Sequence, residues 1–114
     1  METFWQVYLL PEAEQELAAL DEREQDAMQN ALAKLEAFGP QLPWPHSSDV
    51  KSYRALRELR PRQGRSRWRA FYRQVGSAMV IGAIGPEAEV EGREFRRAAQ
   101  QAQDRLDKVQ FGRS

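Results

Sequence analysis

The sequence contains no cysteine and only one histidine, His46. Without cysteine the chain forms no disulfide bond and no thiolate metal site, and one histidine cannot supply a histidine-based metal cluster. The longest apolar run, from Ala78 to Ile84, is far too short to cross a bilayer. Residues 1–5 lack the basic region and the apolar run of a signal peptide. We therefore expect a cytoplasmic protein without a metal centre and without a membrane span.

Charge is abundant and unevenly distributed along the chain. The 114 residues carry 17 bases and 17 acids, so the formal net charge is zero. Residues 51–73 hold nine bases and one acid, a net +8, whereas residues 1–50 hold ten acids and two bases, a net −8. A basic band interleaved with aromatic residues favours a phosphate backbone, through counterion release and base stacking. The alternative is a solvated strand face that pairs with the acidic half of the same fold.

The hydrophobic pattern indicates a single domain, 1–114, of the α+β class. We expect these elements in order: a strand over 4–10, a helix from 11, a helix from about 21 to 38, a loop over 39–52, strands over 56–60, 65–75 and 78–84, and a helix over about 91–109. The order β-α-α-β-β-β-α predicts a helical hairpin packed on one face of a four-stranded, mostly antiparallel sheet.

Side chains alternate across a strand, and this period divides the long basic strand into two faces. One face carries Trp68, Ala70 and Tyr72, which we expect to pack on the helices. The other face carries a row of arginines with one aromatic residue: Arg65, Arg67, Arg69, Phe71 and Arg73. We expect this row to lie on the open face of the sheet. Four like charges on one strand face repel each other, and an anion would relieve that repulsion.

The preceding strand offers two candidate buried faces, and the alternation of Leu59 with Ala55 favours the face that leaves Glu58 and Arg60 beside the arginine row. An ionised Glu58 among guanidinium groups could orient an arginine or act as a base. The alternative is a salt-bridge spacer without chemistry. His46 is a general acid or base by residue type, but its Pro-rich loop is equally typical of an exposed side chain.

Three segments together resemble a known family: Leu56-Arg-Glu-Leu-Arg60, the pair Gly64-Arg65, and Trp68-Arg-Ala-Phe-Tyr72. With the order of elements, they resemble the RelE/HigB/ParE superfamily of toxins from bacterial type II toxin–antitoxin systems, and most closely its HigB-like, phage-derived branch. The resemblance implies a RelE-like fold and a ribosome-dependent endoribonuclease that cleaves messenger RNA. In such enzymes the ribose 2′-hydroxyl attacks the adjacent phosphate, so no cofactor is expected.

The resemblance also assigns roles to individual residues. Arg69 matches the superfamily arginine of the central strand, and Arg60 and Arg65 fall at the other basic positions of the strand pair. Glu58 stands where the HigB-like branch commonly has glutamate, and we include it among the catalytic candidates. The expected RNA-binding residues are Lys51, Arg54, Arg62, Arg67, Phe71, Arg73, Arg93 and Arg97.

The segment after the last strand departs from the family pattern. The family carries a basic stretch there, but this chain is acidic over residues 85–91, before Arg93, Arg96 and Arg97. Two alternatives therefore stay open: a ParE-like toxin that binds a protein target such as gyrase, and a catalytically degenerate nucleic-acid-binding relative. The expected partners are a helix-turn-helix antitoxin, the ribosome with its messenger RNA, and operator DNA reached only through the antitoxin.

Overall fold

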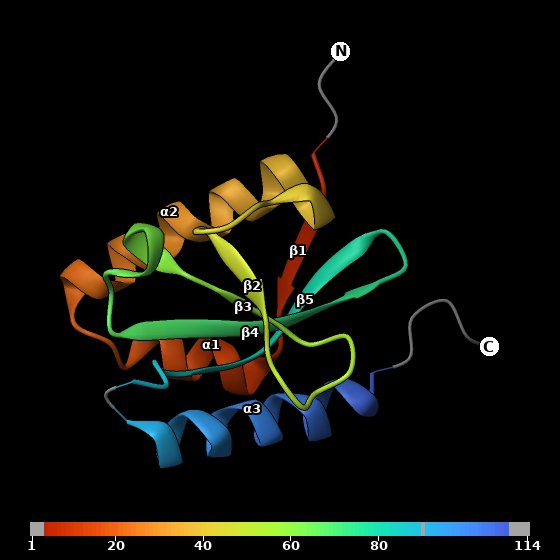
Figure 1. Cartoon of the computed structure of the whole chain (residues 1–114). Helices are drawn as coiled ribbons and strands as arrows, with labels where there is room; N and C mark the ends of the chain where they lie inside the picture. The colour runs from red at the N-terminus through yellow and green to blue at the C-terminus, as the bar shows by residue number, and fades with distance from the viewer. Residues whose placement is uncertain (1–3, 90, 110–114) are drawn as a thin grey trace.

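The computed structural model describes residues 4–89 and 91–109 as a three-layer α+β fold (Figure 1). The sheet lies in the middle, with α2 on one side of it and α3 on the other. The elements are β1 (Gln6–Leu9), α1 (Pro11–Ala18), α2 (Glu22–Phe38), β2 (Ser47–Asp49), β3 (Arg57–Leu59), β4 (Trp68–Val75), β5 (Ala78–Pro86) and α3 (Gly92–Asp107). Among the residues described, no helix is long and apolar enough to cross a membrane.

The sheet has five strands in the order β1-β5-β4-β3-β2. β1 pairs with β5 in parallel, and the other three pairs of strands are antiparallel. The predicted fold class is confirmed, with one strand more than the four we expected. The additional strand is β2, whose residues Ser47–Asp49 lack β-branched and aromatic side chains and become extended by pairing with β3.

The helical hairpin covers one face of the sheet, as predicted. Asp21 caps α2 by accepting a hydrogen bond from the Glu24 backbone N–H at 2.9 Å, and Gly39 ends the helix with a φ of 58°. Ala70 and Tyr72 are buried in this layer, with Trp68 packed against it. The prediction for this face of the basic strand is therefore confirmed.

The opposite face of the sheet is not open, because α3 covers it. Four small or aliphatic residues of α3 form a second core against β4 and β5: Ala98, Ala99, Ala102 and Leu106. Gly82 and Gly85 let the helix approach, since a Cβ on Gly82 would lie 2.9 Å from the Leu106 side chain and one on Gly85 would overlap that of Ala98. Phe71 is 0% exposed here, with its ring 5.2 Å from that of Phe95. The predicted open arginine face is therefore wrong for the part that α3 covers.

Candidate active-site cleft

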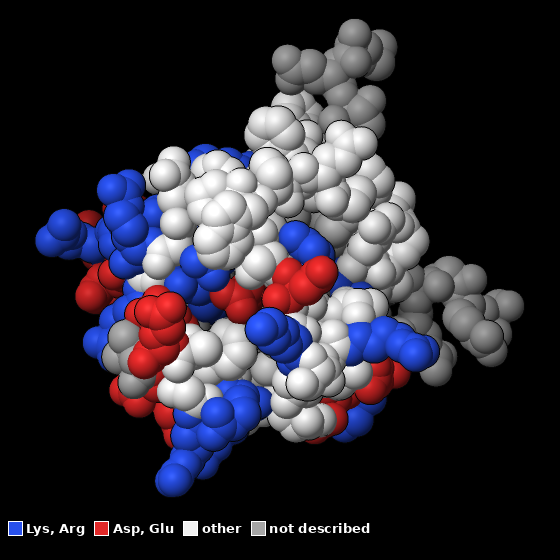
Figure 2. Space-filling view, viewed as in Figure 1, with Lys and Arg blue, Asp and Glu red and all other residues white. Residues whose placement is uncertain are grey.

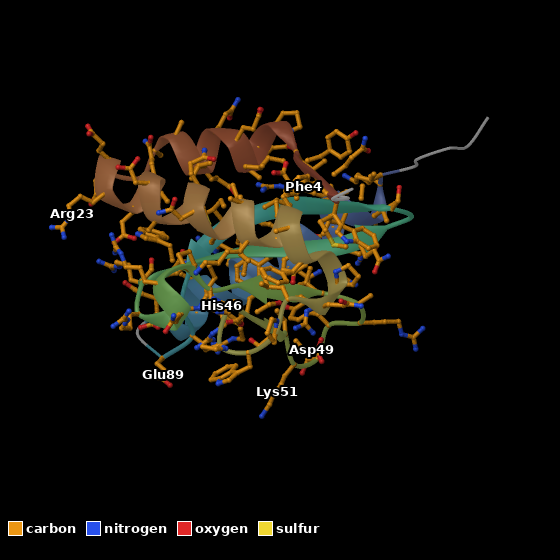
Figure 3. All side chains as sticks on the ribbon, turned by 90° about the horizontal axis from the view of Figure 1, so that it is seen from above. Phe4, Arg23, His46, Asp49, Lys51 and Glu89 are labelled. Atoms are coloured by element: carbon orange, nitrogen blue, oxygen red, sulfur yellow. The ribbon has the colours of Figure 1, made fainter. Side chains whose placement is uncertain are left out.

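A cleft of about 370 Å³ opens where β2, β3 and β4 meet the segment that joins β5 to α3. Glu58, Arg60 and Arg69 line it from the sheet, Glu87 from the joining segment, and Lys51 from the loop after β2. Figure 3 shows Lys51 and Glu89 projecting on the same side of the molecule, with Asp49 between them. The cleft therefore gathers four of the predicted site residues: Lys51, Glu58, Arg60 and Arg69.

Arg69 lies at the centre of the cleft wall and is only 3% exposed. Its guanidinium donates five hydrogen bonds: Nε to Glu58 Oε1 (3.1 Å), Nη1 to the carbonyls of Ser66 (2.6 Å) and Trp68 (2.9 Å), and Nη2 to the Gly64 carbonyl (3.2 Å) and Glu87 Oε2 (3.0 Å). A guanidinium has five N–H donors, so each has a partner. Burial and the nearby Arg60 lower the pKa of Arg69, while Glu58 and Glu87 oppose that shift.

The turn Pro61–Gly64 presents backbone carbonyls to Arg69. Arg62, Gln63 and Gly64 adopt left-handed backbone conformations, with φ of 54°, 59° and 94°. Gly64 is required there, because a Cβ would lie 2.5 Å from Arg60 Nη2 as well as adopt a strained φ. The Gly64-Arg65 pair thus shapes the turn, whereas the Arg65 side chain itself is exposed outside the cleft.

Glu58 is 8% exposed, and its Oε1 accepts hydrogen bonds from Arg60 Nη1 (2.9 Å) and Arg69 Nε (3.1 Å). The interpretation that Glu58 and Arg60 join the arginine row is confirmed for these contacts. Oε2 accepts no hydrogen bond from the described residues, while the carboxylate lines the cleft. One oxygen of Glu58 is therefore fixed by two cations, and the other is available to a ligand.

Arg60 separates the cleft from a second hollow, since its side chain lines both. Its Nε donates to the Pro45 carbonyl at 3.1 Å, and its guanidinium lies 4.3 Å from the ring centre of Trp44. His46 lines the second hollow and not the cleft. Catalysis by His46 in concert with Glu58 is therefore not supported by their placement.

The acidic segment after β5 folds onto the arginines of β4 and of the turn before it. Glu87 forms an ion pair with Arg69 at 3.0 Å, and Glu91 lies 3.8 Å from Arg67. The Glu87 backbone N–H donates to the Arg67 carbonyl at 2.8 Å, which anchors the segment. Val90 of the predicted acidic stretch lies outside the described residues. The departure from the family pattern thus places a carboxylate on the arginine predicted to meet phosphate.

Most of the basic band is neutralised within the fold. Six of its nine bases form ion pairs: Arg57, Arg60, Arg62, Arg67, Arg69 and Arg73. Their partners include Glu24 and Asp49 from the acidic first half. Figure 2 accordingly shows acidic and basic side chains side by side on the face of the molecule that it presents. Within residues 4–89 and 91–109, Lys51, Arg54 and Arg65 form no ion pair.

Several predicted RNA-binding residues lie away from the cleft. Arg73 bonds Asp107 and Gln103 of α3, and Phe71 offers no surface to RNA because α3 covers its ring. Arg93 and Arg97 are exposed on the first turns of α3, where Arg97 pairs with Glu94 at 3.6 Å. The sequence reasoning did not assign Glu87 or Trp44 to the site. The signals that could have found them were the acidic departure after the last strand and an aromatic residue in a Pro-rich loop.

The fold and the cleft define a class of protein: a small α+β domain whose antiparallel strands carry a Glu–Arg–Arg cluster at the mouth of a cleft. Residues 15–81 match the family model described as "Phage derived protein Gp49-like (DUF891)", and the chain belongs to this family. The predicted membership of the phage-derived branch of the RelE superfamily is thereby confirmed.

Solved structures share the fold at low sequence identity. One is the archaeal RelE–RelB complex from Pyrococcus horikoshii OT3, with a TM-score of 0.52 and 15% identity over 72% of this chain and 93% of that chain. Another is the toxin–antitoxin complex RelBE2 from Mycobacterium tuberculosis, with a TM-score of 0.49 and 19% identity over 77% of this chain and 97% of that chain. A search of curated proteins found no match.

Proposed function

We propose that this protein is the toxin of a type II toxin–antitoxin system and cleaves messenger RNA on the ribosome without a metal ion. The observation that carries the proposal is the Glu58 carboxylate, which two arginines hold in a cleft while its Oε2 remains available. Membership of the Gp49-like family and the RelE-type fold support it.

The cleft offers the groups that a 2′-hydroxyl attack requires. Oε2 of Glu58 would take the proton of the ribose 2′-hydroxyl, the 2′-oxygen would bond to the adjacent phosphorus, and the 5′-oxygen would leave with a proton. Arg60 and Lys51 would stabilise the negative charge that builds on the phosphoryl oxygens. The products would be a 2′,3′-cyclic phosphate and a 5′-hydroxyl end.

Arg69 acts in this scheme chiefly as a positioning residue for Glu58. Its Nη2 would reach the scissile phosphate only if the Glu87 carboxylate moves away, because all five donors are engaged. Arg65 remains a candidate contact at the outside of the site. We propose that a helix-turn-helix antitoxin covers or distorts this cleft, and that the pair binds operator DNA through the antitoxin.

Induced expression with mapping of messenger RNA 5′ ends tests the proposal. The wild-type protein should produce new 5′-hydroxyl ends at preferred codon positions. Glu58→Gln, which keeps the shape of the side chain but cannot accept the proton, should lower cleavage by about 100-fold or more. Glu36→Gln, an exposed change on α2, is the matched control and should cleave like the wild type. Growth arrest with intact messages would contradict the nuclease assignment.

One observation favours a second candidate function, a ParE-like toxin that binds gyrase. Glu87 occupies the donor of Arg69 that faces the cleft, so the described conformation contains its own anion and needs no phosphate. Intact messages together with induction of the DNA-damage response would support this function. RNA binding without cleavage would instead indicate the degenerate relative.

A further inference from the structure

A groove of about 340 Å³ runs along α2 on the far side of Arg60 from the cleft. Its charged and titratable lining consists of Arg23, Asp26, Lys34, His46, Arg60 and Arg62. Figure 3 shows His46 between α2 and the loops that carry Asp49 and Lys51, and Arg23 at the start of α2. The groove therefore continues the surface of the cleft toward α2.

The groove has positive charge that the fold does not neutralise. Arg62 is paired with Glu24 at 3.2 Å, and Arg60 with Glu58 at 2.9 Å. Arg23 and Lys34 have no ion pair within the described ranges, and Asp26 is the one acid lining the groove. Figure 2 shows Lys and Arg side chains gathered over the start of α2, at the left of the view. A groove with this balance favours an anionic ligand.

An exposed aromatic ring stands where the groove meets the cleft. Trp44 is 66% exposed, and the Arg60 guanidinium lies 4.3 Å from its ring centre. Because the guanidinium covers one face, the opposite face is available to another flat ring. Exposed rings of this kind stack on unpaired bases, and such stacking is tolerant of sequence.

We propose that the groove binds the phosphate of a nucleotide next to the scissile one in single-stranded RNA, while Trp44 stacks on its base. This inference rests on the proposed function and adds a flanking subsite to it. Arg23 and Lys34 supply the charge for the phosphate, and Arg60 links the two subsites. An acidic peptide would use the same charges, but it would have no use for an aromatic ring stacked on an arginine at the junction.

Fluorescence anisotropy with a 2′-O-methyl uridine hexamer tests the inference, because this RNA cannot be cleaved by 2′-hydroxyl attack. In the double variant Arg23→Ala/Lys34→Ala, the slope of log K against log salt should become shallower by about 0.7 for each phosphate that the variant no longer neutralises. Trp44→Ala should weaken binding about tenfold with an unchanged slope, and Trp44→Phe should restore part of the affinity. Asp26→Asn should strengthen binding, and the matched control Lys108→Ala should leave it unchanged.

The outcomes separate this inference from the proposed function. If Lys51→Ala in the cleft weakens binding while the double variant keeps the wild-type affinity and slope, the groove subsite is refuted and the cleft stands. If the double variant binds RNA normally but loses binding to poly-glutamate, the groove is a peptide site and the inference is overturned. If the wild type binds the hexamer through the groove yet leaves messages intact in cells, the nuclease assignment fails alone. If the wild type binds no RNA, both fail.

Discussion

Replacement of Arg69 by methionine tests whether this guanidinium is the structural centre of the cleft. Methionine keeps the length and apolar stem of the side chain but removes the charge and all five donors. The change breaks two ion pairs and leaves three backbone carbonyls without that donor. Breaking a buried ion pair by removing one partner costs about 3–5 kcal/mol.

The expected loss lies near the lower end of that range, about 3 kcal/mol. Glu58 keeps its bond to Arg60, and Glu87 is partly exposed, so both carboxylates retain a partner or water. For a domain of this size, such a loss lowers Tm by roughly 12–24 °C. Total stability of small domains is about 5–15 kcal/mol, so the variant should fold with a narrow margin.

Urea unfolding followed by tryptophan fluorescence measures the loss. A double-mutant cycle with Glu58→Gln and Glu87→Gln assigns it, and the coupling of Arg69 to the more buried Glu58 should be the larger of the two. The exposed Arg65→Met is the matched control and should change stability by less than about 0.5 kcal/mol. A loss below about 1 kcal/mol for Arg69→Met would refute the reasoning and show that the guanidinium is not locked in place. If the large loss is found, reduced toxicity of an Arg69 variant is no proof of a chemical role.

Three further predictions concern the acidic segment, the basic surface and the packing of α3. Glu87→Gln removes the carboxylate on Arg69 and should raise RNA affinity at low salt, whereas Glu94→Gln should change it less; equal effects in an anisotropy titration would contradict the role of Glu87. RNA binding by the wild type should weaken steeply with added salt because it rests on phosphate contacts, and a flat response would exclude the basic residues as the contact surface. Gly85→Ala should lower stability by about 1–3 kcal/mol in thermal melts because the new methyl group overlaps Ala98, and an unchanged Tm, with exposed Ser77→Ala as control, would show that α3 can move away.

The sequence was sufficient to predict the elements that have strong local signals. Helix α2 has an acidic capping residue at one end and a glycine at the other, and both were recognised. The alternation along β4 correctly placed Trp68, Ala70 and Tyr72 toward the helices. The same alternation brought Glu58 and Arg60 to the face that carries Arg69.

The remaining features depend on contacts between distant segments. β2 has no hydrophobic alternation and exists through its pairing with β3. The covering of Phe71 by α3 could not be read from β4 alone, although Gly82 and Gly85 in the adjacent strand are compatible with a close helix. The partner of Arg69 lies 18 residues further along the chain at Glu87, and no local pattern predicts that ion pair.

The contacts of Arg69 have a consequence for the evolution of the family. One side chain ties together β3, the turn before β4 and the segment after β5, so positions 58, 69 and 87 share a single electrostatic balance. A change to lysine at position 58 or 87 would place two cations against each other in a buried site, and only a compensating change elsewhere would restore the balance. Among relatives, these three positions should therefore vary together, and a sequence that is basic after β5 should carry a different arrangement at position 58.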